Sequence, residues 1–436
     1  MADIYWQGFI VVKKSYLWYD RQELKMWRCG YLKALRNFAA SRRCKDLIVM
    51  AVVLEAFFLA LSPMVAEISL LIGFVIYLFR WRMDRNHHFK KTPVFGAIAV
   101  FMLCGAASIL VSPDRGFSFY NWYNLAVVYC MTFVLVTQNV TTRDEIKVVA
   151  YALGLSALLV VADGFYQFIF GIDTADMKWV DGEAFPELRK RVFATWENPN
   201  ILAAYLDIVI CVLLGLFAKL KDRDARIGLA LFMVACLACL AMTYARGALL
   251  TIAVIMGCYG MLKDRRILLA LILVAGGVLA MDPVLLERMQ TAFLVADTSS
   301  EMRIAMWEST VQMIMDHPLL GIGWGAYWMV YPQYDTYIVD GSVTLVHAHN
   351  IYLNYWAEIG LIGGTAFLWY FFKTMGLALF NKRILADNLM EGLLLGLGLA
   401  LVSVALNGVT DDVLFNIPSS MLLWLLCGLV YAIRRI

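Results

Sequence analysis

The feature that most constrains this chain is a series of long apolar runs, many of which reach the roughly 20 residues that a helix needs to cross a bilayer. Of its 436 residues, 62% are hydrophobic and 16% are charged, and a soluble domain carries roughly 25% charged residues. Helices and closed barrels are the two structures that satisfy backbone polar groups in lipid, and runs of this length predict helices. We therefore expect an all-α polytopic membrane protein with about twelve transmembrane helices. The runs lie at 46–64, 66–82, 93–112, 122–138, 148–170, 200–219, 227–244, 248–262, 267–281, 351–380, 391–409 and 418–433.

The placement of positive charge predicts the orientation. With the N-terminus in the cytoplasm, 28 of the 37 Lys and Arg residues fall on the cytoplasmic side, 8 fall on the outer side, and Lys373 falls within a span. The reverse orientation would invert the positive-inside rule almost completely. We predict that both termini are cytoplasmic.

This topology divides the chain into four regions. Residues 1–45 are basic with interspersed Trp and Tyr, which is typical of an amphipathic cytoplasmic segment lying on an anionic leaflet. We expect no cleavable signal there and no nucleic-acid partner. Residues 46–281 hold nine spans and an outside loop at 171–199, and residues 351–436 hold the last three spans. Between them, 282–350 is a long extracytoplasmic loop, in which the periodicity of residues 301–315 predicts a helix against the membrane.

The nine cysteines fall in apolar runs or in the basic N-terminal segment, so a disulfide framework is not expected. Cys236 and Cys239 form a C-x-x-C within an apolar run, where packing explains them better than redox or metal chemistry.

Evidence for a metal or for nucleotide hydrolysis is weak. The nearest carboxylate pairs, Asp181 with Glu183 and Asp411 with Asp412, flank no histidine at ligand spacing. The chain also lacks G-x-x-x-x-G-K-[ST]. We expect no metal, no cofactor and no ATP-driven pump.

The strongest candidates for chemistry lie at the predicted outer boundary. His349 and Asn350 stand where the long loop ends and an apolar span begins, and helix capping is the alternative explanation. Arg246 lies between two apolar spans with almost no loop, where a charge usually has a partner or a function, although it could also extend to the headgroups. Arg303 and Trp307 lie one helical turn apart, and a surface ion pair is the alternative for Arg303.

A further basic run ends at Arg191, just before Asn198-Pro199-Asn200, which is a good capping arrangement. Planar guanidinium groups suit bidentate recognition of phosphate, and histidine is the natural general base near neutral pH. Together these groups fit a pyrophosphate-activated substrate reached from the membrane.

Four stretches in order resemble the O-antigen ligase and O-antigen polymerase superfamily of bacterial envelope glycosyltransferases. They are residues 191–200, residues 243–248, residues 302–307 running into 318–323, and residues 349–364. The order and topology agree over about residues 45–435, and the basic N-terminal segment is not part of the resemblance.

The resemblance implies a C-type glycosyltransferase membrane fold in the bacterial cytoplasmic (inner) membrane, with an extracytoplasmic active site. Such proteins move a glycan from undecaprenyl diphosphate to an acceptor sugar with inversion, without metal and without nucleotide sugar. His349 would be the catalytic base, and Arg246 and Arg303 would hold the diphosphate. Candidates for further substrate binding are Arg191, Asn198, Trp307 and Glu358.

Several alternatives remain open at this point. The acceptor could be a lipid A–core sugar, as for a ligase, or another lipid-linked glycan, as for a polymerase, and we favour the ligase. A transporter or flippase of lipid-linked glycans would require charged groups near the middle of the membrane and two related halves, and the sequence has no such symmetry. A membrane scaffold without catalysis is the third possibility. Membrane lipids are expected partners in every case.

Overall fold

The computed structural model describes residues 32–86, 88–171, 191–281, 298–335, 345–380 and 387–436. Within these ranges the chain is helical and contains no strand. The elements are α2 (Arg42–Phe58), α3 (Pro63–Met83), α4 (Phe95–Ser108), η1 (Ile109–Val111), α5 (Arg115–Trp122), η2 (Tyr123–Val127), α6 (Val128–Asn139), α7 (Arg143–Phe170), η4 (Ala194–Trp196), α8 (Pro199–Lys219), α9 (Arg223–Met242), α10 (Arg246–Leu262), α11 (Arg265–Met281), α13 (Thr298–Asp316), α14 (Tyr327–Val330), η5 (Tyr331–Gln333), α15 (Ile351–Leu379), α16 (Asn388–Asn407), η6 (Val413–Phe415) and α17 (Ile417–Arg435).

Each of the twelve apolar runs coincides with helix in the structure, which confirms an all-helical membrane protein. Among the described residues, 7 segments are long and apolar enough to cross a bilayer by length and composition. The other runs form shorter helices, such as the 17-residue α2 and α10, or the bent α15. The count of twelve crossings therefore stays a prediction. The seven segments are α3, the continuous helix α5–η2–α6, α7, α8, α9, α16 and α17.

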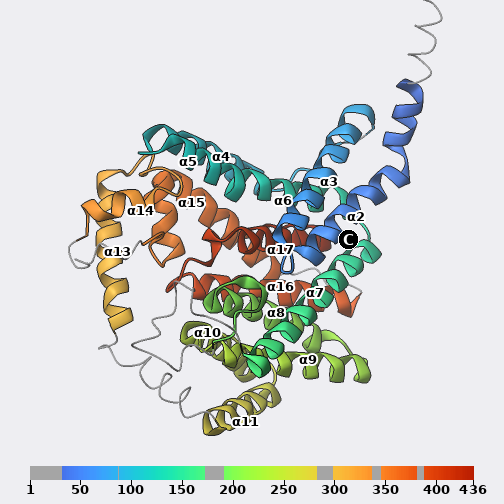
Figure 1. Ribbon diagram of the computed structural model, residues 1–436. Coiled ribbons are helices and arrows are strands. Elements are labelled where there is room, and N and C mark those ends of the chain that lie inside the picture. Colours follow the sequence, from blue (N-terminus) through green and yellow to red (C-terminus); the bar gives the residue numbers. More distant parts are fainter. Residues whose placement is uncertain (1–31, 87, 172–190, 282–297, 336–344, 381–386) are drawn as a thin grey trace, which may run out of the picture.

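The helices form one bundle, with α13 and α14 at one end and the C-terminus at the opposite end (Figure 1). α8, α16 and α17 are buried along most of their length, whereas α3 and α9 present most of theirs outward. The contact between α8 and α16 depends on small residues. A Cβ atom added to Gly215 would lie 2.2 Å from the backbone nitrogen of Gly396, so the two backbones touch directly, as is typical of membrane helix pairs.

A bend in α15 shapes the end of the bundle that carries α13. Gly360 has φ of 75° inside the helix, and a Cβ there would lie 2.1 Å from the carbonyl oxygen of Leu319. The freed backbone groups are satisfied by the turn that follows α13: Leu361 N–H donates to Pro318 (2.9 Å) and Ile322 N–H donates to Ala357 (2.9 Å). Only glycine fits this bend, which fixes the turn against α15.

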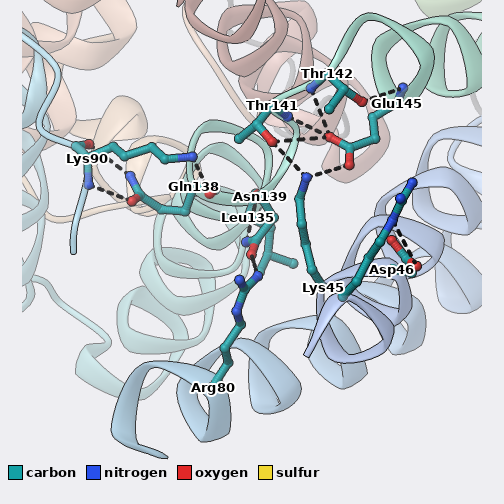
Figure 2. A network of polar contacts seen from close by, with 11 residues as sticks. Lys45, Asp46, Arg80, Lys90, Leu135, Gln138, Asn139, Thr141, Thr142 and Glu145 are labelled. Atoms are coloured by element: carbon teal, nitrogen blue, oxygen red, sulfur yellow. Dashed lines mark hydrogen bonds and ion pairs between the residues drawn. The ribbon is translucent and has the colours of Figure 1, made fainter. Parts of the chain in front are cut away.

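A polar network closes the opposite end, which the charge distribution predicts to be cytoplasmic (Figure 2). Lys45 of α2 forms an ion pair with Glu145 of α7 and donates to the hydroxyl of Thr141 (2.7 Å). Lys90 and Gln138 exchange hydrogen bonds through their backbone and amide groups, with Lys90 N–H donating over 2.8 Å. The network joins the ends of α2, α6 and α7 to the segment before α4.

The helix predicted at residues 301–315 is confirmed as α13. Most of the predicted amphipathic N-terminal segment lies outside the described residues, as do Asp181 and Glu183.

Candidate functional site

Three arginines that stand far apart in the sequence line one cavity of about 160 Å³. Arg191 precedes η4, Arg246 is the first residue of α10, and Arg303 lies on α13. Asp411, in the loop between α16 and η6, is the one acidic residue that the described part of the chain contributes to the lining. Among the described residues, the lining is Arg191, Asn200, Ala204, Tyr244, Ala245, Arg246, Gly247, Ala248, Arg303, Asn407, Thr410, Asp411 and Val413.

Hydrogen bonds of Arg191 join the first two of these segments. Its Nε donates to the carbonyl of Thr243 (2.7 Å), and its Nη2 donates to Oδ1 of Asn200 (2.7 Å). Val192 N–H donates to the carbonyl of Met242 (3.1 Å). Arg191 is thereby held at the start of both α8 and α10. The partial positive charge of two helix N-termini adds to that of the guanidinium groups, and the cavity favours an anion.

Asn407, which lines the cavity, belongs to a buried polar chain across three helices. Asn407 of α16 accepts from the hydroxyl of Thr251 on α10 (2.9 Å) and donates to the carboxyl of Asp207 on α8 (2.8 Å). Both ends of the Asn407 amide are therefore engaged, which fixes its orientation beneath the arginines.

His349 is joined to this cavity through Asp411. Its Nδ1 lies 3.0 Å from Oδ1 of Asp411. Burial raises the pKa of the Asp411 carboxyl, but the hydrogen bond and charge of His349, with His347 beside it, outweigh burial and lower the pKa to about 2. The carboxylate therefore accepts a hydrogen bond from Nδ1–H, and in the neutral imidazole this tautomer leaves the Nε2 lone pair available as an acceptor.

The segments around the cavity hold strained backbone. In the described part of the chain, four non-glycine residues have positive φ: Ala194 (47°), Glu197 (59°), Tyr244 (52°) and His349 (46°). Each such residue costs on the order of 1–3 kcal/mol and persists only where surrounding contacts require it. All four lie in the turns that carry Arg191, Arg246 and His349 themselves.

Asn350 fixes the backbone next to His349. Its Oδ1 caps α15 by accepting from Leu353 N–H (3.0 Å), and its Nδ2 donates to the carbonyl of Val409 (3.0 Å). Ile351 N–H donates to the carbonyl of Gly408 (2.8 Å). The capping role predicted for Asn350 is confirmed, and the same residue brings His349 to the loop that carries Asp411.

Trp307 holds the segment that carries His349 against α13. Its indole Nε1 donates to the carbonyl of Ala348 (3.1 Å), directly before His349. Since Arg303 lies one turn earlier on the same helix, this bond also sets the distance between Arg303 and the histidine segment.

The other two predicted residues lie apart from the cavity. Asn198 caps α8 by accepting from Asn200 N–H (2.8 Å), and Asn200 rather than Asn198 is part of the lining. Glu358 is buried on α15 and lines a different cavity. The structure thus brings together Arg191, Arg246 and Arg303, with His349 joined to them through Asp411.

Sequence reasoning considered Asp411 only as a weak metal ligand and overlooked Asn407 and Thr410. A signal was present, because Asp411 follows the run 391–409 and so falls on the predicted outer side with His349. Proximity to a particular histidine could not be read from that position.

One group of described side chains could hold a metal ion. His347, His349 and Asp411 offer one ligand atom each, and these atoms lie within 4.8 Å of one another. Burial, with the nearby charge of His349, lowers the pKa of His347 to about 3, so its imidazole is neutral and able to ligate. Metal independence therefore stays a prediction.

The apolar helices and the cationic cavity between their ends define an integral membrane protein equipped to bind an anion. Comparison with known families narrows this class: the sequence model of the family described as O-Antigen ligase matches residues 229–368. The match runs from α9 into α15 and includes Arg246, Arg303 and His349. The predicted resemblance to the O-antigen ligase superfamily is confirmed, and the match supports a membrane glycosyltransferase of the ligase or polymerase type. No curated protein matches the chain.

Proposed function

We propose that this protein is an inverting, metal-independent glycosyltransferase. It moves a glycan from an undecaprenyl-diphosphate carrier to an acceptor sugar on the outer face of the bacterial cytoplasmic membrane, in the manner of an O-antigen ligase. The observation that carries the proposal is the convergence of Arg191, Arg246 and Arg303 on one cavity whose acidic member, Asp411, bonds His349.

The arginine cavity would hold the diphosphate of the donor. Guanidinium groups bind phosphate oxygens in bidentate fashion and stay charged at every physiological pH. When the bond between the anomeric carbon and the diphosphate breaks, negative charge grows on the leaving oxygen. Arg246 and Arg303 would stabilise that charge without needing a metal ion.

His349 would act as general base. Its Nδ1 is engaged by Asp411, so Nε2 takes the proton of the acceptor hydroxyl. The acceptor oxygen bonds to the anomeric carbon as the bond to the diphosphate oxygen breaks, undecaprenyl diphosphate leaves, and the proton remains on His349. One direct displacement inverts the anomeric configuration.

The ligase and polymerase alternatives share this chemistry and differ in the acceptor. A ligase would use a lipid A–core sugar or another terminal acceptor, and a polymerase would use a second lipid-linked glycan. Both place the termini in the cytoplasm and the site outside. Purified protein in nanodiscs with lipid-linked glycan decides between them: ladder formation without another acceptor shows a polymerase, and single transfer to a lipid core shows a ligase.

The same assay tests catalysis against transport and scaffolding. We expect His349→Ala to abolish transfer, whereas His317→Ala, an exposed histidine at the end of α13, should retain it. Full transfer by His349→Ala together with lost movement of lipid-linked glycan across vesicles would refute the enzyme and favour a flippase. If cells that carry the His349→Ala, Arg246→Ala or Arg303→Ala variant each still display the glycan on their surface, a scaffold would be favoured.

A further inference from the structure

A second cavity, of about 220 Å³, lies beside the histidine segment and is not used by the chemistry described above. It is bounded by residues of α5, the glycine-rich turn after α13, α14, α15 and η6. The lining is Phe117, Asn121, Leu125, Trp324, Gly325, Trp328, Val346, His347, Asn354, Tyr355, Glu358, Asp412, Leu414 and Phe415.

The histidine segment, residues 347–349, contacts the linings of both cavities. His347 lines the second cavity, and its ring packs against that of His349 with centroids 4.3 Å apart. Its Nδ1 accepts from the backbone N–H of His349 (3.2 Å). Asp411 lines the arginine cavity, whereas its neighbour Asp412 lines the second one. His349 therefore contacts one lining residue of each cavity, Asp411 of the first and His347 of the second.

Aromatic side chains form one side of the second cavity. The rings of Phe117 and Trp328 meet edge to face with centroids 6.0 Å apart, and the ring of Phe415 lies 4.4 Å from that of His347. Phe117, Trp328 and Phe415 are 36%, 39% and 39% exposed, so each offers part of its surface to a ligand.

The polar groups of the second cavity differ from those of the first. No Lys or Arg of the described chain is part of its lining, which makes it a poor site for phosphate. Instead it holds two buried carboxyl groups, Asp412 and Glu358, and the amides of Asn121 and Asn354. Aromatic faces combined with carboxyl and amide groups suit a ligand that has C–H surfaces and many hydroxyl donors.

We propose that the second cavity is the subsite for a sugar residue of the acceptor glycan, an inference that rests on the proposed function. Its volume is below the roughly 300–1,000 Å³ of most small-molecule sites and suits a single sugar ring. The C–H face of the ring packs on Trp328 and Phe117, and its hydroxyls donate to Asp412. A displacement with inversion needs the acceptor hydroxyl to approach from the side opposite the diphosphate, so the acceptor needs a site separate from the arginine cavity. The second cavity is such a site, and its lining residue His347 contacts His349.

The test is to measure the KM for the acceptor and the KM for the lipid-linked donor independently in the transfer assay. We expect Trp328→Ala and Phe117→Ala each to raise the KM for the acceptor by about tenfold while the KM for the lipid-linked donor changes by less than about twofold. Trp328→Phe should restore most of the acceptor affinity because it keeps an aromatic face. The matched control is Phe119→Ala, an exposed phenylalanine of the same α5 that does not line the cavity.

A binding measurement makes the inference independent of turnover. Saturation-transfer NMR on the protein in nanodiscs, with methyl glycosides of glucose, galactose and N-acetylglucosamine as probes, should show contact that Trp328→Ala removes. Equal signals in both proteins, with an unchanged acceptor KM, would overturn the subsite. A rise in donor KM alone would overturn the assignment to the acceptor. Glycoside contact that depends on Trp328 in a protein without transferase activity would keep the subsite and refute the proposed function.

Discussion

Each end of the helix bundle carries a hydrogen-bonded pair of titratable side chains that joins segments far apart in the sequence, but the surroundings of the two pairs differ. At one end Lys45 and Glu145 lie in a network that also caps α7, where Thr142 and Glu145 exchange hydrogen bonds with each other's backbone. At the other end Asp411 lines a cavity and contacts His349, which has a strained φ of 46°. A pair that also completes a helix cap serves the fold. A pair held in strain beside a cavity is available for chemistry.

The largest expected effect is the loss of transferase activity when a cavity arginine or His349 is replaced, which would show that this end of the bundle carries the chemistry. We expect Arg246→Ala, Arg303→Ala and His349→Ala each to lower kcat by at least about 100-fold, because a base or the charge opposite the leaving diphosphate is removed. Membrane insertion should be retained, and kcat is compared per folded molecule. Transfer kinetics with thermal unfolding of each purified variant measure both. Arg115→Ala, at an exposed position on α5, is the matched control, and equal losses in it would contradict a specific role for the cavity arginines.

Asp411→Asn tests the pair itself. An amide can present its N–H to Nδ1, which would leave the proton on Nε2 and disable the base. We expect kcat to fall by about 10- to 1,000-fold with a smaller change in the donor KM. Transfer kinetics across a pH series measure this change. An unaltered kcat would show that Asp411 does not set the tautomer of His349.

Glu145→Ala addresses the opposite end. It removes a half of the ion pair and of the capping box of α7, so we expect the free energy of unfolding to fall by about 1–3 kcal/mol. Activity per folded molecule should be retained. Thermal unfolding in nanodiscs and transfer kinetics measure the two quantities. A loss of kcat without a loss of stability would contradict the purely structural role of the pair of Lys45 and Glu145.

Asp412 gives a pH dependence of stability. Burial and the charge of Asp411 raise its pKa to about 7 in the folded state, above its ordinary value of 3.8. Between these values the folded protein binds more protons than the unfolded chain, so this group makes stability fall as pH rises from about 4 to about 7. Asp412→Asn should flatten that part of the profile. Tm measured from pH 4.5 to 8 tests this, and an identical slope in the variant would contradict it.

The smallest expected effect is that of metal removal. If His349 acts as a base, excess EDTA should leave transfer unchanged, although His347, His349 and Asp411 lie close enough to share an ion. Transfer activity is measured before chelation, after chelation, and after Mg²⁺ or Zn²⁺ is added back. Loss that is restored by a metal would assign these three residues a ligand role instead.

Length and hydrophobicity of the apolar runs were sufficient to predict the helices, because a segment in lipid must satisfy its backbone hydrogen bonds internally. The same local reasoning found Asn350 as a cap, since a cap bonds to residues two or three positions away. It chose Asn198 over Asn200 for the site because the sequence offers no means of telling which of two neighbouring amides points to a cavity.

The sequence by itself determined the all-helical membrane architecture and marked Arg246 and His349 at the boundaries of apolar spans and Arg303 on the helix of the long loop. Tertiary structure alone decided that the arginines share one cavity with Asp411, that Asp411 bonds His349, and that a second, aromatic cavity is lined by His347, which packs against His349. Helices and their caps depend on contacts between near neighbours in the chain. The cavities depend on packing between residues 191 and 411, and no local pattern encodes such distances.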